Sequence, residues 1–237
     1  MHNAKCIKKL GTPIAFIRAE HTGKGASATK DTAKGLVASM YLAVGAKVLV
    51  TTNVAQRAGI CNGSFGIVKE IVYEEGAGPP ALPKFVLVDL GALYTGPSFF
   101  PLNRERRGWV PIHPVENSWK TPDSQHSFID HSRKMLPLTT AWAFTIWKAQ
   151  GQTFLEQVVL DLGKDEKEHG LAYVAFSRVI RFANIGLRNG ITLDRLTRKI
   201  RNQSKMACRL THEKCLDQNY KLTKVAMAGY TYTPSNL

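Results

Sequence analysis

The stretch of residues 136–153 constrains the fold most, because an apolar run that favours β-structure, residues 138–144, passes directly into a polar loop. Thr145, Lys148 and Gln150 lie in this loop, and a glycine closes it. The pattern predicts a buried strand that ends in a functional loop, since ligands of open α/β sheets bind at the carboxyl ends of strands. The hydroxyl, ammonium and amide groups suit a phosphate chain better than an apolar ligand.

Short strands are predicted in the middle of the chain. Residues 65–73, 84–89 and 109–112 have β-prone patterns, are separated by turn-forming clusters, and show no helical period around them. This spacing predicts a small antiparallel barrel. Further along, residues 157–162 are predicted to form a buried strand, residues 168–178 a helix and residues 180–187 a closing strand.

The net charge points to a polyanionic partner. The 237 residues contain 32 Lys and Arg against 18 Asp and Glu, a formal charge of +14 with a pI near 9.8. Charge alone does not separate DNA from RNA or from an acidic membrane. The chain has no uninterrupted apolar run of about 18 residues, so no membrane span is predicted.

Three motifs resemble those of one enzyme family. Residues 141–153, AWAFTIWKAQGQT, are similar to the AWA-x-TIHKSQG-x-T signature of the PIF-type, RecD-like DNA helicases of superfamily 1. Residues 45–53, GAKVLVTTN, with the GICNG of residues 59–63, resemble a second family motif, and residues 173–178, YVAFSR, resemble YVALSR. These matches correspond only to the C-terminal half of such a helicase.

The resemblance implies an α/β fold. Its core is the second RecA-like domain, a parallel sheet flanked by helices, into which a small antiparallel β-barrel is inserted. The chain is accordingly divided into residues 1–58 and 136–190 for the two parts of the RecA-like domain, residues 59–135 for the barrel, and residues 191–237 for a basic helix and tail. Residues 220–237 lack periodicity and are expected to be loosely ordered.

The resemblance also implies functional residues. Arg178 corresponds to the arginine finger that stabilises charge on the transferred phosphoryl group. Gln150 and Gly151 would join it at the nucleotide. The residues matched to single-stranded DNA are Thr145, Lys148 and Thr153, with Trp147 at the usual histidine position, where it can either stack on a base or pack. Arg104, Arg106 and Arg107 on the insert would lie along the DNA, and the alternative is a solvated charged loop.

ATP and Mg²⁺ are the cofactors of the full-length family enzyme, and none is expected to bind to this chain alone. The Gly23-Lys24 pair lacks the surrounding glycine and hydroxyl residues of a P-loop, and Asp161 lacks the second acid of a magnesium motif. The P-loop would come from a separate N-terminal RecA-like domain. The alternatives are a non-enzymatic single-stranded DNA-binding remnant and, less favoured, an RNA-binding protein.

Other features carry little functional signal. His126, Asp130 and His131 are expected in a solvent-exposed polar loop, and no metal site is predicted. Residues 192–206 are predicted to form a basic helix. The resemblance implies a nuclear location, with the mitochondrion as the alternative.

Overall fold

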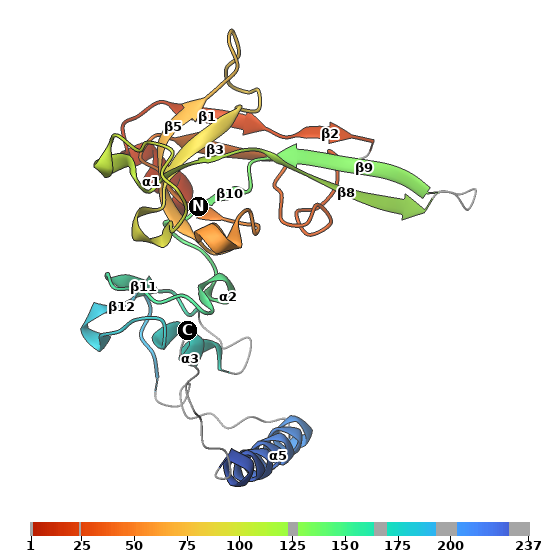
Figure 1. The fold of residues 1–237 in the computed structure, drawn as a ribbon, viewed down its shortest axis with the longest axis vertical. Coiled ribbons are helices and arrows are strands. Elements are labelled where there is room, and N and C mark those ends of the chain that lie inside the picture. Colours follow the sequence, from red (N-terminus) through yellow and green to blue (C-terminus); the bar gives the residue numbers. More distant parts are fainter. Residues whose placement is uncertain (1, 24, 123–127, 164–169, 193–202, 228–237) are drawn as a thin grey trace, which may run out of the picture. The chain divides into compact units, whose positions relative to one another are not determined.

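The computed structural model describes residues 2–23, 25–122, 128–163, 170–192 and 203–227 (Figure 1). The chain divides into two compact units, residues 1–152 and residues 153–237, and each is described by itself. None of the helices in the described ranges is long and apolar enough to cross a membrane. The predicted basic helix over residues 192–206 lies largely outside the described residues.

Unit 1 is built mainly from antiparallel strands. A five-stranded sheet has the order β10-β4-β5-β6-β7, a three-stranded sheet has the order β2-β9-β8, and β1 pairs with β3. The elements are α1 (His2–Lys9), β1 (Ile14–Arg18), β2 (Glu20–Thr22), β3 (Ser39–Ala43), β4 (Lys47–Val50), β5 (Phe65–Val72), β6 (Phe85–Asp89), β7 (Trp109–Ile112), β8 (Val115–Pro122), β9 (Phe128–Met135), β10 (Leu138–Thr140) and α2 (Ile146–Ala149), with short 3-10 turns η1 (Gln56–Ala58), η2 (Gly91–Leu93) and η3 (Arg104–Arg106).

The core of unit 1 consists of the apolar residues that alternate along these strands. Val48, Val68, Val86, Val88 and Ile112 are fully buried in one cluster with residues of the neighbouring sheets. β-branched side chains pack well on a pleated surface, which is why these segments form strands. The predicted strands over residues 65–73, 84–89 and 109–112 are confirmed as β5, β6 and β7.

Two details of the predicted sheets are wrong. The five-stranded sheet is open, because its edge strands β10 and β7 do not pair with each other. β10 has only three residues, and Pro111 in β7 lacks an N–H for further pairing. In addition, β10 pairs antiparallel with β4 instead of starting a parallel sheet. Periodicity identifies a strand but says nothing about its partner or its direction.

The β8–β9 hairpin forms a long arm next to β2 (Figure 1). The prediction that His131 lies in an exposed polar loop is wrong, because it is in β9, is 1% exposed, and its Nε2 lies 2.7 Å from the Thr121 hydroxyl. Asp130 does lie exposed, and its carboxylate pairs with Lys120. His126 falls outside the described residues.

Arg133 in β9 is also fully buried. Its Nη1 donates to the Leu36 carbonyl at 2.8 Å, and its Nη2 donates to the Gly25 and Ala28 carbonyls at 2.7 Å each. Its Nε donates to Nδ1 of His21 at 3.4 Å. A buried cation is therefore bound by backbone oxygens and fastens the segment of residues 25–36 to β9.

Unit 2 contains parallel pairing. β11 (Val158–Leu160) pairs parallel with β12 (Ile185–Leu187), and Phe154 forms a parallel bridge with Val179. The helices are α3 (Leu171–Phe176) and α5 (Gln203–Met227), with the 3-10 turn η4 (Phe182–Asn184). The expectation of a loosely ordered segment from residue 220 is wrong as far as residue 227, because α5 continues to Met227. The α/β class is thus confirmed, whereas the described strands form no extended parallel sheet.

Candidate nucleic-acid interface

The loop that follows β10 is held by one side chain from the N-terminal helix. The Asn3 amide donates to the carbonyls of Thr140 and Ala143 at 3.1 and 2.8 Å, and its oxygen accepts from the Ala143 N–H at 2.7 Å. These bonds join residues far apart in sequence and fasten the segment between β10 and α2 to α1. The Phe144 ring packs against Phe65, with 5.4 Å between the centroids.

Helix α2 is a single turn that presents the motif side chains. Thr145 precedes it in an extended conformation and makes no side-chain capping bond. Trp147 is 51% exposed, Lys148 is exposed, and Ala149 packs inward. The one-turn geometry therefore leaves the hydroxyl, indole and ammonium groups available at the surface of unit 1.

The turn after α2 is anchored at its far end. Gly151 has a φ of +80° with open space around its Cα, and Gln150 is exposed beside it. The Gln152 amide donates to the Gly63 carbonyl at 3.0 Å, which ties the turn to the Asn62-Gly63 corner before β5. Only a residue that tolerates the left-handed region closes this turn without strain.

The charge of Lys148 acts on Lys30, a residue outside the three motifs. Burial, and next the charge of Lys148, lower the pKa of Lys30, while Asp31 acts in the opposite direction. Nothing in the sequence pattern around residue 30 signals this position, because the interaction joins two distant segments.

Two threonines belong to the same region of unit 1. The hydroxyl oxygens of Thr51 and Thr52 are buried and have no hydrogen-bond partner among the described residues. The segment that carries Lys30 packs against them, since a Cβ placed on Gly35 would lie 3.8 Å from the Thr51 carbonyl oxygen. Buried hydroxyls normally find a partner, so these two are notable.

Arg104 and Arg106 of the predicted barrel lie in the 3-10 turn η3, and Arg107 directly follows it. The Asn103 side chain caps this turn by accepting from the Glu105 and Arg106 N–H groups. The Arg106 guanidinium stacks on the Trp109 and Phe100 rings, 4.8 and 5.6 Å from their centroids. Arg104 and Arg107 are exposed on either side of it.

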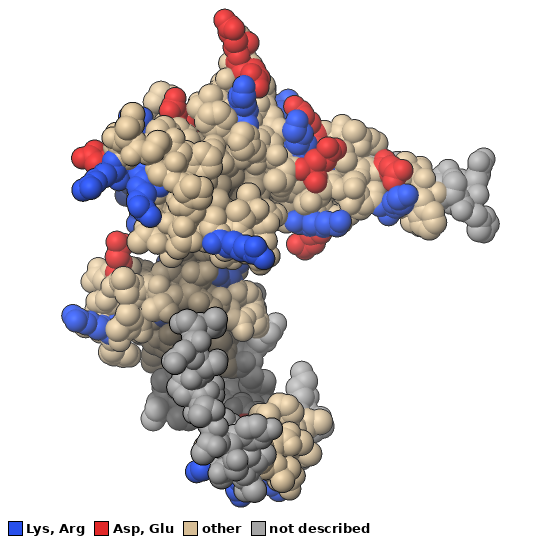
Figure 2. All heavy atoms as spheres, viewed as in Figure 1, with Lys and Arg blue, Asp and Glu red and all other residues tan. Residues whose placement is uncertain are grey.

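Four other lysines of unit 1 are paired with acids. Figure 2 shows Lys and Arg side chains dispersed over the visible face, several of them next to Asp or Glu. Among the ion pairs are Lys69–Asp89, Lys84–Glu74, Lys120–Asp130 and Lys134–Glu20, with N–O distances of 3.3 to 3.5 Å. A positive total charge therefore does not by itself identify the binding surface.

Arg178 and Thr153 lie in unit 2, whereas Lys148, Gln150 and Gly151 lie in unit 1. Arg178 follows α3, and its Nε donates to the Val174 carbonyl at 2.9 Å while Nη2 donates to the Ser177 hydroxyl at 2.8 Å. The Arg178 carbonyl accepts from the Phe154 N–H at 2.8 Å, which brings the segment after Thr153 next to the segment after α3.

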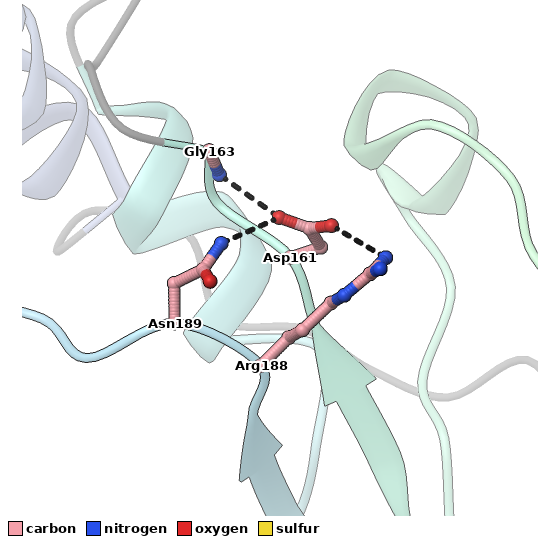
Figure 3. Close-up of polar contacts among 4 residues, drawn as sticks. All are labelled: Asp161, Gly163, Arg188 and Asn189. Carbon is pink, nitrogen blue, oxygen red and sulfur yellow. Dashed lines mark hydrogen bonds and ion pairs between the residues drawn. The ribbon is translucent and has the colours of Figure 1, made fainter.

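Asp161, the acid at the end of β11, is engaged by its neighbours (Figure 3). One carboxylate oxygen accepts from Arg188 at 3.0 Å, and the other accepts from the Gly163 N–H and the Asn189 amide at 3.2 Å each. No group of three or more His, Cys, Asp or Glu residues lies together in the described parts of the chain. The Asp161 carboxylate is thus engaged by donors of the protein itself.

Comparison with known proteins identifies relatives. No family model matches the sequence. The chain is 34% identical over 139 residues to the ATP-dependent DNA helicase PIF1 of Danio rerio, which covers 59% of this chain and 18% of that protein. The Pif1 helicase from Candida albicans has a similar fold, with a TM-score of 0.59 and 22% identity over 90% of this chain and 47% of that chain. The Bacteroides Pif1 bound to ssDNA also has a TM-score of 0.59, with 20% identity over 90% of this chain and 44% of that chain.

In sequence the chain is therefore similar to DNA helicases, and its fold is similar to that of solved DNA helicases. Within that class the similarity is to the PIF1-type helicases, as the three motifs predict. The chain spans about half the length of the solved Pif1 chains, which is consistent with the predicted C-terminal half, and a smaller share of the curated relative.

Proposed function

We propose that this chain is the C-terminal motor half of an ATP-dependent 5′-to-3′ DNA helicase that binds single-stranded DNA. The observation that supports this most is the run of residues 141–153, whose hydroxyl, indole and ammonium groups are exposed at one short helix in unit 1. The parallel β11–β12 pair and the Phe154–Val179 bridge would belong to the sheet of a RecA-like domain, and the open sheet of unit 1 would include the β-insert.

Single-stranded DNA would be held through its backbone. Thr145 and Lys148 would contact phosphates, Trp147 would stack on a base, and Thr153 would act from unit 2. Arg104 and Arg107 would add phosphate contacts, whereas Arg106 is already stacked on two rings and would mainly support the turn. Phosphate contacts and stacking do not read base identity, so binding should be independent of sequence.

Arg178 would act as the arginine finger. ATP supplies the phosphoryl group that such a motor transfers to water. Gln150 and Gly151 would contact this nucleotide. A guanidinium stays charged and can donate two parallel bonds, so it is suited to stabilise charge on phosphate oxygens. The Nε and Nη2 bonds to Val174 and Ser177 would orient the side chain. The P-loop would come from an N-terminal RecA-like domain.

A binding experiment tests whether the chain binds single-stranded DNA through its backbone phosphates. We expect the chain to bind fluorescein-labelled oligothymidylate, and the logarithm of affinity to fall with the logarithm of salt concentration with a slope of about −2 to −3, as for three or four phosphates on a single strand. Lys148→Ala should lower the affinity and Lys84→Ala, whose lysine pairs with Glu74 away from the motif, should not. A flat salt response would refute the electrostatic argument, and preference for RNA of equal length would favour the RNA-binding alternative.

An ATPase experiment tests the proposed role of Arg178 in ATP hydrolysis. The chain alone should show no turnover, because a P-loop is not among its residues. In a chimera where it replaces the matching half of the Candida albicans Pif1 helicase, DNA-stimulated hydrolysis should return and fall about a thousandfold or more with Arg178→Ala. Arg181→Ala is the matched control, since Arg181 is an exposed arginine three residues later. A folded chimera that binds DNA without hydrolysis would favour the non-enzymatic remnant.

A further inference from the structure

We propose that strand β8 pairs with β8 of a second copy of this chain, so that two hairpin arms join into one continuous sheet. Each copy would contribute its three-stranded sheet, β2-β9-β8. The proposal rests on the free edge of β8 and on the charges beside that edge, and it does not depend on the proposed DNA-binding function. The arm that carries the edge is visible in Figure 1.

β8 is the longest strand at the edge of any sheet among the described residues. It has eight residues, Val115–Pro122, and pairs only with β9. The edges of the five-stranded sheet are short by comparison, because β10 has three residues and β7 has four, with Pro111 among them. No described residue bonds to the outward N–H and C=O groups of β8. Such a row of unpaired backbone groups is a template for a further strand.

Only one face of β8 is covered by the rest of unit 1. On the covered face, the Asn117 amide donates to the Ala33 carbonyl at 3.2 Å. The opposite face carries three exposed side chains, those of Glu116, Ser118 and Lys120. Since side chains alternate between the two faces of a strand, an added strand would place every second side chain next to these three.

The exposed face of the arm carries two rows of alternating charge. In the first row Lys134 of β9 lies between its register partners Glu20 and Glu116, and it pairs with Glu20 at 3.4 Å. In the second row Lys120 lies opposite Asp130 of β9, and the two pair at 3.5 Å. At the free edge the first row therefore ends in a carboxylate and the second row in an ammonium group.

Antiparallel pairing of two β8 strands brings these two ends together. A twofold axis at Ser118 places Glu116 of each copy directly opposite Lys120 of the other copy, because both residues lie two positions from Ser118. Directly opposite residues share one face, where opposite charges stabilise the pair. The charges would then alternate without interruption from one copy into the next, in the order Glu20, Lys134, Glu116 of the first copy and Lys120, Asp130 of the second.

The side chain on the proposed axis also suits self-pairing. Two Ser118 hydroxyls would face each other, and cross-strand hydroxyl pairs can hydrogen-bond. A pair of this kind is already present in the same sheet, where the hydroxyl oxygens of Thr22 and Ser132 lie 2.9 Å apart. A parallel copy in register would instead place Glu116 beside Glu116 and Lys120 beside Lys120. The order of the charges therefore favours an antiparallel second copy.

Sedimentation velocity of the 237-residue chain at increasing concentration tests the proposal. We expect the mass to rise from 26.2 kDa towards twice that value. Glu116→Lys and Lys120→Glu should each weaken self-association by about tenfold to a hundredfold, because each turns two attractive pairs into two repulsive ones. When the two variants are mixed, association should return, since a lysine then faces a glutamate at both pairs. Lys84→Glu, a charge reversal in a surface ion pair outside the arm, should behave like the wild type.

Hydrogen exchange locates the contact in the chain. The outward amides of β8 should become protected as the concentration rises, whereas the amides of β7, another edge strand, should not. Thermal unfolding of both charge variants should resemble that of the wild type, because the reversed side chains are exposed. A loss of association that the mixture reverses is therefore a change in pairing and not in folding.

Several results would overturn the proposal. It is wrong if the wild type stays monomeric at every concentration, or if neither charge reversal weakens the dimer. It is also wrong if the mixture of variants fails to associate, or if protection appears outside β8 alone. Oligothymidylate binding reports separately on the proposed function, so a wild type that dimerises through β8 without binding DNA would refute that function and leave the paired edge standing.

Discussion

Replacement of Arg133 by methionine is the most informative single change in this protein. The guanidinium makes three short bonds to the carbonyls of Gly25, Ala28 and Leu36, and a longer one to His21. Methionine has a similar length and is apolar, so the variant removes the donors without leaving a large cavity. The carbonyls would then lack partners unless the segment opens to water.

The expected loss of unfolding free energy in this variant is the result of two opposing contributions. Each carbonyl deprived of a partner costs about 1 to 3 kcal/mol, so the three together cost roughly 3 to 9 kcal/mol if all stay buried. Against this, the variant no longer buries a cation, whose desolvation is several kcal/mol. Partial rehydration of the segment lowers the cost further. We expect a net loss of about 2 to 4 kcal/mol of unfolding free energy.

Urea denaturation followed by the fluorescence of the four tryptophans measures this change. Lys134→Met is the matched control, because Lys134 is the next residue in β9, is exposed, and makes only a surface ion pair with Glu20. That control should lose less than about 1 kcal/mol. Hydrogen exchange should accelerate for the amides of residues 25–36 in the Arg133 variant alone.

An Arg133→Met protein as stable as Lys134→Met, with unchanged exchange in residues 25–36, would refute the claim that this buried arginine organises the segment.

Three further predictions concern other parts of the chain. Gly59→Ala should lower the free energy of unfolding by about 2 to 4 kcal/mol, because φ is +80° and the new Cβ would overlap the Leu93 carbonyl oxygen. Gly76→Ala, at φ +75° in open space, is the control and should lower it by about 1 kcal/mol. Equal losses in urea denaturation would contradict this prediction. Asp161→Ala should lower the free energy of unfolding by only about 1 kcal/mol, since its ion pair with Arg188 is exposed, and should leave hydrolysis by the chimera largely intact; complete loss of activity would instead indicate a metal ligand. Burial and the charge of Arg133 lower the pKa of His21, so the stability it contributes is present above its unfolded pKa of about 6.5 and is lost as pH falls through the lower folded pKa. Unfolding between pH 5 and 7 should show this slope, and His21→Asn should reduce it; an equal slope in both proteins would count against it.

The strand positions of unit 1 could be predicted because they depend on local signals. Alternating apolar residues and turn clusters marked β5, β6 and β7 within a few residues of their ends. Their partners could not be predicted, since antiparallel and parallel pairing use the same alternation. For the same reason the short β10 was placed in the wrong kind of sheet.

Some residues of the candidate site could likewise be predicted from the sequence, and others could not. Lys148 and Arg178 were found from motif resemblance, and their roles stay predictions. The buried cation Arg133 was missed, although it lies in phase with buried His131 and Met135 along β9. His131, Arg133 and Met135 occupy every second position of the strand, so they point to the same face of the sheet. An arginine at such a position is usually expected to be exposed, because charged side chains are rarely fully buried.

The amino-acid sequence by itself predicted the strands β5, β6 and β7 and the similarity to PIF1-type helicases, because both depend on residues that are close together in the chain. Tertiary structure alone decided which distant segments meet. It surrounded Arg133 with carbonyls from a separate segment, residues 25–36. Contacts of this kind depend on sheet pairing and register, which arise only when the whole core packs.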